Sequence, residues 1–240
     1  MEPVASARPS ARRLADDHHY VVATYIPAGG RTGQDVAVRQ QRADGYDFGI
    51  IECDVADYDA CETMARQMEK ECGRIDVLVN AAGITRDATL RKMDPESWHA
   101  VLDTNLDSVF NVTRNFIDMM VERQYGRVIN ISSVNGQKGQ LGQTNYSAAK
   151  AGMVGFTKSL ALELADSKVT VNTVSPGYVA TRMVEAIPDE VKQQIISKIL
   201  LAGWAGPRKS PALWPTWPAR TVATSPALIL SSQRWPVHWL

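Results

Sequence analysis

Short apolar runs alternate along the chain with longer segments in which apolar residues recur every three or four positions. The short runs are rich in β-branched and aromatic residues, which predicts strands, whereas the longer period predicts amphipathic helices. The predicted strands are Tyr20–Ile26, Phe48–Cys53, Ile75–Val79, Arg127–Ile131 and Val169–Val174. Regular alternation of strand and helix favours a single α/β domain over residues 1–240, built on a doubly wound parallel sheet.

Capping residues predict where the intervening helices begin and end. Asp57 is suited to the N-cap of one helix, and Gly73 lies just past its end. Asp94 and Pro95 predict the start of a long helix, since proline fits the first helical position. Its apolar positions are Trp98, Val101, Leu102, Val109, Phe116 and Met120. A further helix is predicted from Tyr146 to about residue 164. Ligands of such folds bind at the carboxyl ends of the strands, so the functional site is expected there.

Composition narrows the functional classes. Among 240 residues, 26 basic and 26 acidic side chains balance, which indicates neither a nucleic-acid surface nor a polybasic membrane patch. The three cysteines lack metal-ligand spacing, so no metal is expected, and their odd number suits a reducing compartment. No apolar run approaches the roughly 20 residues of a membrane span, and the N-terminus lacks the apolar core of a signal peptide. We therefore expect a soluble cytoplasmic protein without nucleic-acid or membrane partners.

Residues 130–150 carry the candidate chemistry. Tyr146 and Lys150 are four residues apart in a predicted helix, so their side chains share one face. A nearby ammonium lowers the pKa of a phenol, which can then exchange a proton with a carbonyl oxygen. Ser133 could hold that same oxygen, and this combination indicates carbonyl reduction. Taken alone, however, Ser132 and Ser133 would more often cap a strand end, and a lone Tyr-x-x-x-Lys arises by chance.

The complete set of motifs resembles the short-chain dehydrogenase/reductase family over about residues 12–200. The set comprises Tyr146-Ser-Ala-Ala-Lys150, Ser133, Asn105, the turn Asn80-Ala-Ala-Gly83 and the segment Ser175-Pro-Gly177. The resemblance implies a Rossmann-like fold and hydride transfer from a nicotinamide cofactor to a carbonyl. It also implies that Tyr146 protonates the oxygen and that Ser133 positions it. Lys150 would lower the Tyr146 pKa and hold the cofactor ribose, and Asn105 would support a proton-relay water.

The resemblance extends to the cofactor contacts, although Ala81 replaces an asparagine that is usual in the family. By position, the implied cofactor-binding residues are Asp54, Val55, Asn80, Ala81, Ala82, Gly83, Ile84, Thr85, Tyr146, Lys150, Pro176, Gly177, Tyr178 and Val179. An acidic residue after the second strand favours NADH, whereas an arginine suits the 2′-phosphate of NADPH. After Tyr20–Ile26 the first charged residue is Arg31, and Asp35 follows only later. We therefore expect NADPH rather than NADH.

Three segments are most similar to the family members that reduce acetoacetyl-CoA for polyhydroxybutyrate synthesis: Asn80–Lys92, Ser133–Tyr146 and Ser175–Met183. This resemblance implies an (R)-3-hydroxybutyryl-CoA product and a homotetramer. The implied substrate-binding residues are Asp87, Lys92, Gln140, Leu141, Gly142, Gln143 and Tyr178. Two alternatives stay open. One is a 3-oxoacyl-[acyl carrier protein] reductase, against which the run Gly136–Gln143 favours the CoA thioester. The other is an inactive pseudo-enzyme that lacks cofactor affinity.

Both ends of the chain depart from the family pattern. No strand followed by a glycine-rich, pyrophosphate-binding turn precedes Arg12, and residues 201–240 predict neither a closing strand nor a helix. We hypothesise shifts of the reading frame. Codons for Glu2–Ser10, read two nucleotides later, permit Thr-Gly-Gly-Ile-Gly, and those from Leu201 onward permit Gly-Arg-Leu-Gly-Arg-Pro-Glu-Glu-Ile. The present chain should then bind NADPH weakly and fold poorly. Clean in-frame codons across both ends of the gene would contradict this hypothesis.

Overall fold

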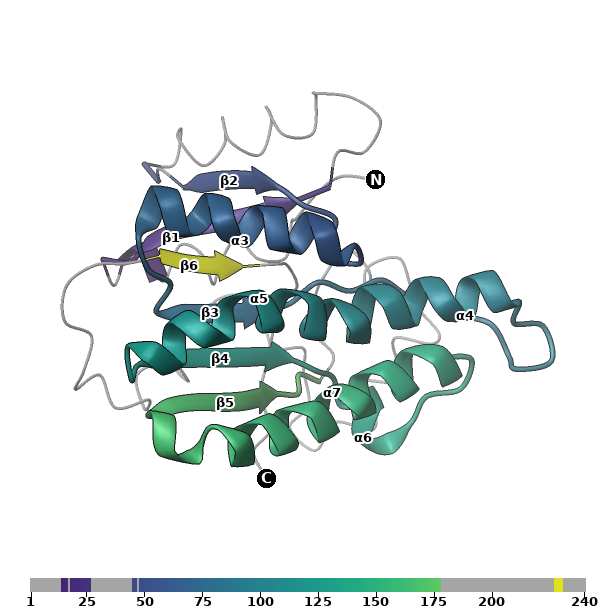
Figure 1. The fold of residues 1–240 in the computed structure, drawn as a ribbon. Helices are drawn as coiled ribbons and strands as arrows, with labels where there is room; N and C mark the ends of the chain where they lie inside the picture. Colours follow the sequence, from purple (N-terminus) through teal and green to yellow (C-terminus); the bar gives the residue numbers. More distant parts are fainter. Residues whose placement is uncertain (1–13, 17, 27–44, 47, 178–226, 231–240) are drawn as a thin grey trace.

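The computed structural model describes residues 14–16, 18–26, 45–46, 48–177 and 227–230, and these residues form a six-stranded sheet (Figure 1). The strand order is β2-β1-β6-β3-β4-β5, and each neighbouring pair is parallel. The strands are β1 (Tyr20–Tyr25), β2 (Gly49–Glu52), β3 (Val77–Asn80), β4 (Gly126–Ile131), β5 (Val169–Val174) and β6 (Ala227–Leu230). The first five overlap the predicted apolar runs, so the parallel α/β prediction is confirmed.

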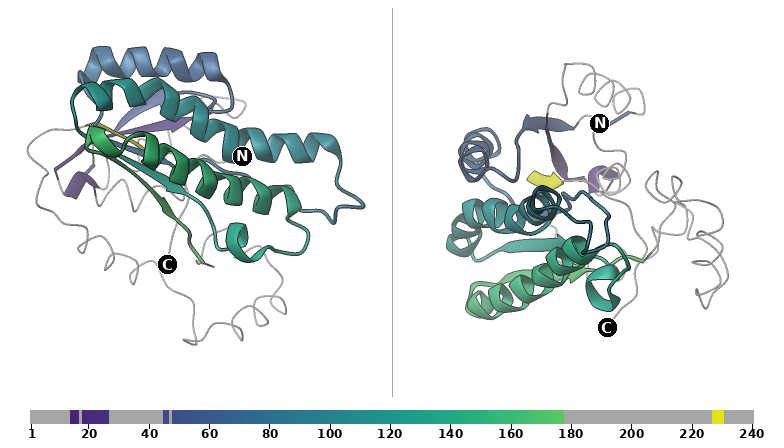
Figure 2. Two further views of the ribbon diagram at one scale, coloured as in Figure 1. Left: turned by 60° about the horizontal axis from the view of Figure 1, so that its bottom comes forward. Right: turned by 90° about the vertical axis from the view of Figure 1, so that its right-hand side faces the viewer.

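The longer helices lie side by side on one face of this sheet (Figure 2). The helical elements are α3 (Tyr58–Cys72), α4 (Pro95–Leu102), η1 (Asp103–Asp107), α5 (Ser108–Glu122), α6 (Asn135–Lys138), α7 (Thr144–Glu163) and η2 (Ala165–Ser167). None of them, within the described part of the chain, combines the length and apolar character that a bilayer crossing requires.

Both faces of the sheet carry buried apolar side chains from the strands β1 and β3. Successive strand residues point to opposite faces, so Val22 and Leu78 pack into the core that also holds α3 and α5 residues. Their neighbours Val21 and Val79 pack into a second cluster with Leu14. A sheet buried on both faces is what the doubly wound prediction requires.

The predicted helix caps are present. The Asp57 carboxylate accepts hydrogen bonds from the backbone N–H groups of Asp59 (2.9 Å) and Ala60 (3.1 Å). Gly73 closes α3 with a φ of 69°, in the left-handed region that favours glycine. Asp94 caps α4, with proline at the first helical position. The cap residues therefore fix the local boundaries that the sequence predicts.

The long helix predicted from Asp94 is interrupted by a π-helical turn. α4 and α5 are joined by η1 (Asp103–Asp107), a π-helical turn whose backbone hydrogen bonds span five residues instead of the four of an α-helix. Within this turn the Asn105 side chain donates to the backbone carbonyl of Val101, at 2.8 Å. The apolar periodicity on either side of the turn gives no indication of this interruption.

The prediction that residues 201–240 provide no strand is wrong for Ala227–Leu230. These four apolar residues form β6 in the middle of the sheet, between β1 and β3. Leu228 pairs with Val21 on one side and with Val77 on the other. The strand therefore gives the backbone N–H and C=O groups of both neighbours a parallel partner.

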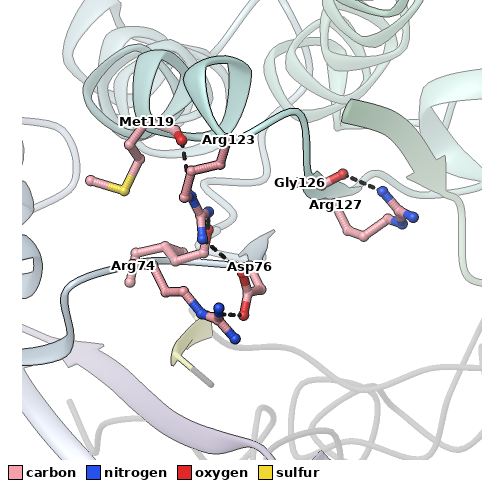
Figure 3. A network of polar contacts seen from close by, with 7 residues as sticks. Arg74, Asp76, Met119, Arg123, Gly126 and Arg127 are labelled. Atoms are coloured by element: carbon pink, nitrogen blue, oxygen red, sulfur yellow. Dashed lines mark hydrogen bonds and ion pairs between the residues drawn. The ribbon is translucent and has the colours of Figure 1, made fainter. Parts of the chain in front are cut away.

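A charged network lies at the N-terminal ends of β3 and β4 (Figure 3). Asp76 forms ion pairs with Arg74 (3.3 Å) and Arg123 (2.9 Å). Arg123, at the end of α5, also donates to the backbone carbonyls of Met119 and Ile75. This network ties the end of α5 to the start of β3, away from the edge where the predicted site residues lie.

Candidate active site

The predicted site residues gather at the carboxyl ends of the parallel strands. Asp54 and Val55 follow β2, the turn 80–85 ends β3, and Ser132 and Ser133 follow β4. After β5, the Pro176 carbonyl accepts a hydrogen bond from the Val134 N–H at 2.9 Å, which holds that segment beside the β4 turn. The strand ends therefore place the predicted cofactor and catalytic residues along one edge, as the parallel topology requires.

α7 carries Tyr146 and Lys150 against this edge. Lys150 is only 3% exposed, and its Nζ donates to the Ile131 carbonyl (2.8 Å) at 5.8 Å from the centre of the Tyr146 ring. Ser132 Oγ donates to the backbone carbonyl of Lys150 at 2.7 Å, which fixes α7 to the end of β4. A Cβ on Gly136 would lie 2.8 Å from the Lys150 carbonyl carbon, so only glycine lets α6 approach α7 this closely.

Burial shifts the pKa values of both groups. It lowers the pKa of Lys150 to about 7, and it raises the pKa of Tyr146 above its ordinary value. A hydrogen bond with Ser133 lowers the Tyr146 pKa in part, and the Asp87 charge raises it. The prediction that Lys150 brings the Tyr146 pKa below its ordinary value is therefore wrong for this structure, because burial favours the neutral form of both side chains. A tyrosine with a raised pKa keeps its proton at neutral pH, which suits a proton donor.

Asn105 and Lys150 both lie close to Gly83. In η1 the Asn105 side chain is fully buried, and its Nδ2 donates to the carbonyls of Ile84 (3.0 Å) and Val101 (2.8 Å). Its Oδ1 is buried without a hydrogen-bond partner among the described residues. A buried acceptor left unpaired costs about 1–3 kcal/mol, so a donor such as water or a ligand hydroxyl would be stabilised here.

Gly83→Ala should damage the site through this contact. The new Cβ would lie 2.5 Å from Asn105 Oδ1 and 3.6 Å from Lys150 Nζ, so the Asn105 side chain would have to move. We expect kcat/KM for carbonyl reduction to fall roughly tenfold to a hundredfold, which is the effect of one or two misplaced hydrogen bonds. Gly155→Ala is the matched control, because a Cβ there meets nothing within 4 Å. Equal activity of both variants would contradict the contact as a site constraint.

Asn80, predicted as a cofactor contact, uses its side chain inside the core. Its Nδ2 donates to Thr113 Oγ1 (3.0 Å) and Asn130 Oδ1 (2.8 Å), and Asn130 Nδ2 donates to Thr157 Oγ1 (2.9 Å). This buried ladder connects α5, β3, β4 and α7. Asn80 therefore holds the start of the turn that follows β3. The backbone of that turn lies at the carboxyl ends of the strands.

The residues after β2 are held by α5. Val55 is buried and Asp54 is exposed. Asn111 Nδ2 donates to the carbonyls of Val55 and Ala56, both at 3.1 Å, and so fixes this turn against the helix. Tyr178 and Val179, two further predicted contacts, lie outside the described residues, as do Arg31 and Asp35.

The described residues fit the ribose and nicotinamide end of a dinucleotide. Gly83, without a side chain, lets the turn after β3 lie close to Asn105 and Lys150, whose Nζ can donate to ribose hydroxyls, and the unpaired Asn105 Oδ1 marks a position for a further donor. The glycine-rich turn that would hold the pyrophosphate is not among the described residues. The fit therefore rests on the strand ends of β2, β3 and β5 and on α7.

Part of the predicted substrate set comes together beside Tyr146. Ala88 N–H donates to the Gly142 carbonyl at 2.9 Å, and Gln143 Nε2 donates to Asp87 Oδ2 at 2.9 Å. Gly142 has a φ of 78°, a conformation that glycine adopts without strain. The Gln140 carbonyl accepts from the Gln143 N–H at 3.1 Å. The other two predicted residues with described positions, Lys92 and Leu141, are exposed.

Asn145, which no sequence motif singled out, holds α7 at its start. Asn145 is fully buried, and its Nδ2 donates to the carbonyls of Arg86 (3.0 Å) and Ser97 (3.2 Å). Its Oδ1 accepts from the Tyr146 N–H at 2.8 Å. An asparagine beside the first residues of a predicted helix was the available signal, since asparagine often pairs with unsatisfied N–H groups there.

Comparison with known proteins identifies the family. The family model for short chain dehydrogenases matches residues 8–192. The chain belongs to this family. It is therefore an oxidoreductase with a Rossmann-like fold. The chain is similar to the acetoacetyl-CoA reductase of Cupriavidus necator, at 54% identity over 188 residues, which cover 78% of this chain and 76% of that protein.

Two further relatives extend the comparison. The 3-oxoacyl-[acyl-carrier-protein] reductase of Staphylococcus aureus is 42% identical over 195 residues, which cover 81% of this chain and 78% of that protein. A crystal structure of gluconate 5-dehydrogenase from Burkholderia cenocepacia, in complex with NADP and tartrate, superposes with a TM-score of 0.76 at 28% identity. That match covers 83% of this chain and 78% of the other. A nicotinamide cofactor is consistent with these relationships.

Proposed function

We propose that the chain reduces acetoacetyl-CoA to (R)-3-hydroxybutyryl-CoA with NADPH, a step of polyhydroxybutyrate synthesis. The observation that carries the proposal is the convergence of Ser133, Tyr146 and Lys150 at the end of β4, with Asn105 and Lys150 both close to Gly83. This arrangement offers a hydroxyl donor and a protonated phenol to one substrate oxygen, and a buried amine to the cofactor ribose.

The side chains take separate parts in the reaction. Bound NADPH supplies the hydride that the carbonyl carbon receives. Ser133 donates a hydrogen bond to the carbonyl oxygen, and Tyr146 gives that oxygen its proton. Lys150 holds the cofactor ribose with the Nζ that now donates to Ile131. Asn105 binds a water through its unpaired Oδ1, and this water returns a proton towards Tyr146.

The preference for NADPH is supported by the reductive direction of the proposed reaction and by the order of charges after β1, where arginine precedes the first acid. The gluconate 5-dehydrogenase of similar fold was crystallised with NADP. We further propose that one domain spans residues 1–240, that the protein assembles as a homotetramer and that it acts in the cytoplasm.

The CoA thioester is favoured over a carrier-protein substrate by the segment 136–143 and by the higher identity to the Cupriavidus necator relative. In the structure this segment meets the turn at Asp87, so a thioester lying along it would reach Ser133 and Tyr146. The Staphylococcus aureus relative keeps the carrier-protein alternative open, because its name states that substrate.

A direct assay separates these alternatives. NADPH consumption is measured with acetoacetyl-CoA and with the acetoacetyl-carrier protein, for the present chain and for a chain whose reading frame is restored at both ends. We expect the restored chain to prefer acetoacetyl-CoA by at least about tenfold in kcat/KM, a difference of roughly 1.4 kcal/mol. The present chain should bind NADPH more weakly in calorimetry.

Other results of the NADPH assay and of the calorimetry would contradict a specific part of the proposal. A preference for the carrier protein would replace the proposed substrate. Failure of both chains to consume NADPH with either substrate would favour the pseudo-enzyme and overturn the proposal. Equal NADPH affinity of the two chains would remove the reason for the frame-shift hypothesis.

A further inference from the structure

The side chains of Asp87, Gln143 and Asn135 form a hydrogen-bonded relay, which the backbone N–H of Asn135 extends to Ser133. Gln143 Nε2 donates to Asp87 Oδ2 at 2.9 Å, and Asn135 Nδ2 donates to Gln143 Oε1 at 3.0 Å. The backbone N–H of Asn135 then donates to Ser133 Oγ at 3.1 Å. The Asp87–Ser133 relay therefore consists of Asp87, Gln143, Asn135 and Ser133, and it joins three segments of the site.

The carboxylate of Asp87 sets the direction of the relay. A carboxylate only accepts hydrogen bonds, so Gln143 must turn its NH₂ group towards Asp87. Its oxygen is then left facing Asn135, which must present its own NH₂ group. The Asn135 oxygen is consequently turned away from both, and it is buried without a partner among the described residues. The orientation of each amide thus follows from its neighbour rather than from an arbitrary choice.

The relay ends on the hydroxyl that touches the reacting oxygen. Because Ser133 Oγ accepts from the Asn135 N–H, its own proton is free to be donated, and the hydrogen bond with Ser133 lowers the Tyr146 pKa. Asn135 is 8% exposed and opens α6, whose Gly136 packs on the backbone of Lys150. The Asn135 backbone contacts Ser133 while the Asn135 side chain is held by Gln143, so a shift of the backbone at Asn135 would change the orientation of Ser133 relative to Tyr146.

We infer that Asn135 is a positioning residue for carbonyl reduction, which couples the Asp87 turn to the orientation of Ser133 through Gln143. The inference rests on the proposed function for its kinetic consequence. Asn135 itself touches neither substrate nor cofactor in this scheme. Its action is to hold Ser133 in the donating orientation while Asp87 occupies the position seen in the structure.

A swap of acid and amide tests the relay. Asn135→Asp places a second acceptor against the Gln143 oxygen, so one hydrogen bond of the relay is lost whichever way the Gln143 amide turns. Adding Asp87→Asn supplies a donor at the other end and allows the whole relay to form in the reverse direction. We expect Asn135→Asp to lower kcat about tenfold or more with a smaller change in KM, and to lower Tm by about 3–6 °C. The double variant should recover most of both losses relative to Asn135→Asp.

A control variant shows whether an asparagine-to-aspartate change lowers kcat only when it is made in the relay. Asn115→Asp makes the same substitution on α5, where the side chain donates to the Asn111 carbonyl of its own helix, and it should leave kcat unchanged. If Asn135→Asp does not fold, a second cycle uses Gln143→Glu, which keeps the contact with Asn135 and loses only the one with Asp87. Asp87→Asn should again restore the missing donor.

Additive losses in the double variants, in both kcat and Tm, would overturn the relay. Coupling in Tm with additive losses in kcat would show a structural contact and overturn the positioning role. If the parent protein does not reduce acetoacetyl-CoA, the proposed function fails and the positioning role fails with it, whereas the Tm cycle still decides whether the relay exists. The two failures are therefore distinguishable.

Discussion

Tyr146→Phe should lower kcat for acetoacetyl-CoA reduction by about 10²–10⁴-fold, the usual contribution of a general acid. Phenylalanine fills the same volume and keeps the ring near Lys150 Nζ, now 5.8 Å from the ring centre. It cannot give a proton to the substrate oxygen, and it removes the partner of the Ser133 hydrogen bond. The rate is measured at saturating NADPH, together with the thermal unfolding of each protein.

Tyr58→Phe is the matched control for this loss of one hydroxyl. Tyr58 is 40% exposed and stacks on Phe110 with ring centres 6.0 Å apart, a contact that phenylalanine preserves. Its kcat should equal that of the parent. Turnover of Tyr146→Phe at the parent rate would show that another group is the acid, provided that both variants unfold at similar temperatures.

Lys150→Met should remove most turnover and change how stability depends on pH. The pKa of Lys150 in the folded protein is about 7, below the value near 10.4 of an unfolded chain. Between these values the unfolded state binds more protons, so the stability of the parent should rise with pH. The free energy of unfolding of the parent, relative to Lys150→Met, should rise by about 1.4 kcal/mol per pH unit in the middle of this window and level off beyond its ends.

Chemical denaturation at a series of pH values, without cofactor, measures this difference. Lys158→Met on the same helix is the control, since Lys158 is exposed. Its free energy of unfolding should follow the parent across the window. A constant difference between the parent and Lys150→Met would mean that the Lys150 amine keeps an ordinary pKa in the folded protein.

Local patterns in the sequence were sufficient for most elements of the fold. Strands and caps depend on neighbouring residues, so Asp57, Gly73 and Asp94 could be assigned from the residues around them. The position of the site followed from parallel topology, because strand ends meet at one edge. The pairing of Tyr146 with Lys150 followed from helical spacing, and the family resemblance supplied Ser133 and Asn105.

Features that depend on distant contacts could not be predicted. The π-helical turn forms around Asn105, whose amide bonds Ile84, a residue of another segment. The Tyr146 pKa was predicted in the wrong direction because helical spacing reveals a nearby amine but not the burial of both groups. Asn80 was predicted as a cofactor contact, and nothing in the residues around it indicated that its side-chain amide bonds Asn130, fifty positions away. Each of these outcomes is decided by packing across the sheet.

The position of β6 has a consequence for biosynthesis. Residues 227–230 stand between β1 and β3 but are synthesised long after both, about two hundred positions after β1 and about one hundred and fifty after β3. Until they arrive, the nascent chain presents two open strand edges, the kind of surface that pairs with other chains and aggregates. Closing such long loops is slow, because the entropy must be lost before the contacts form. Aggregation of the nascent chain should therefore compete with the insertion of β6 into the sheet.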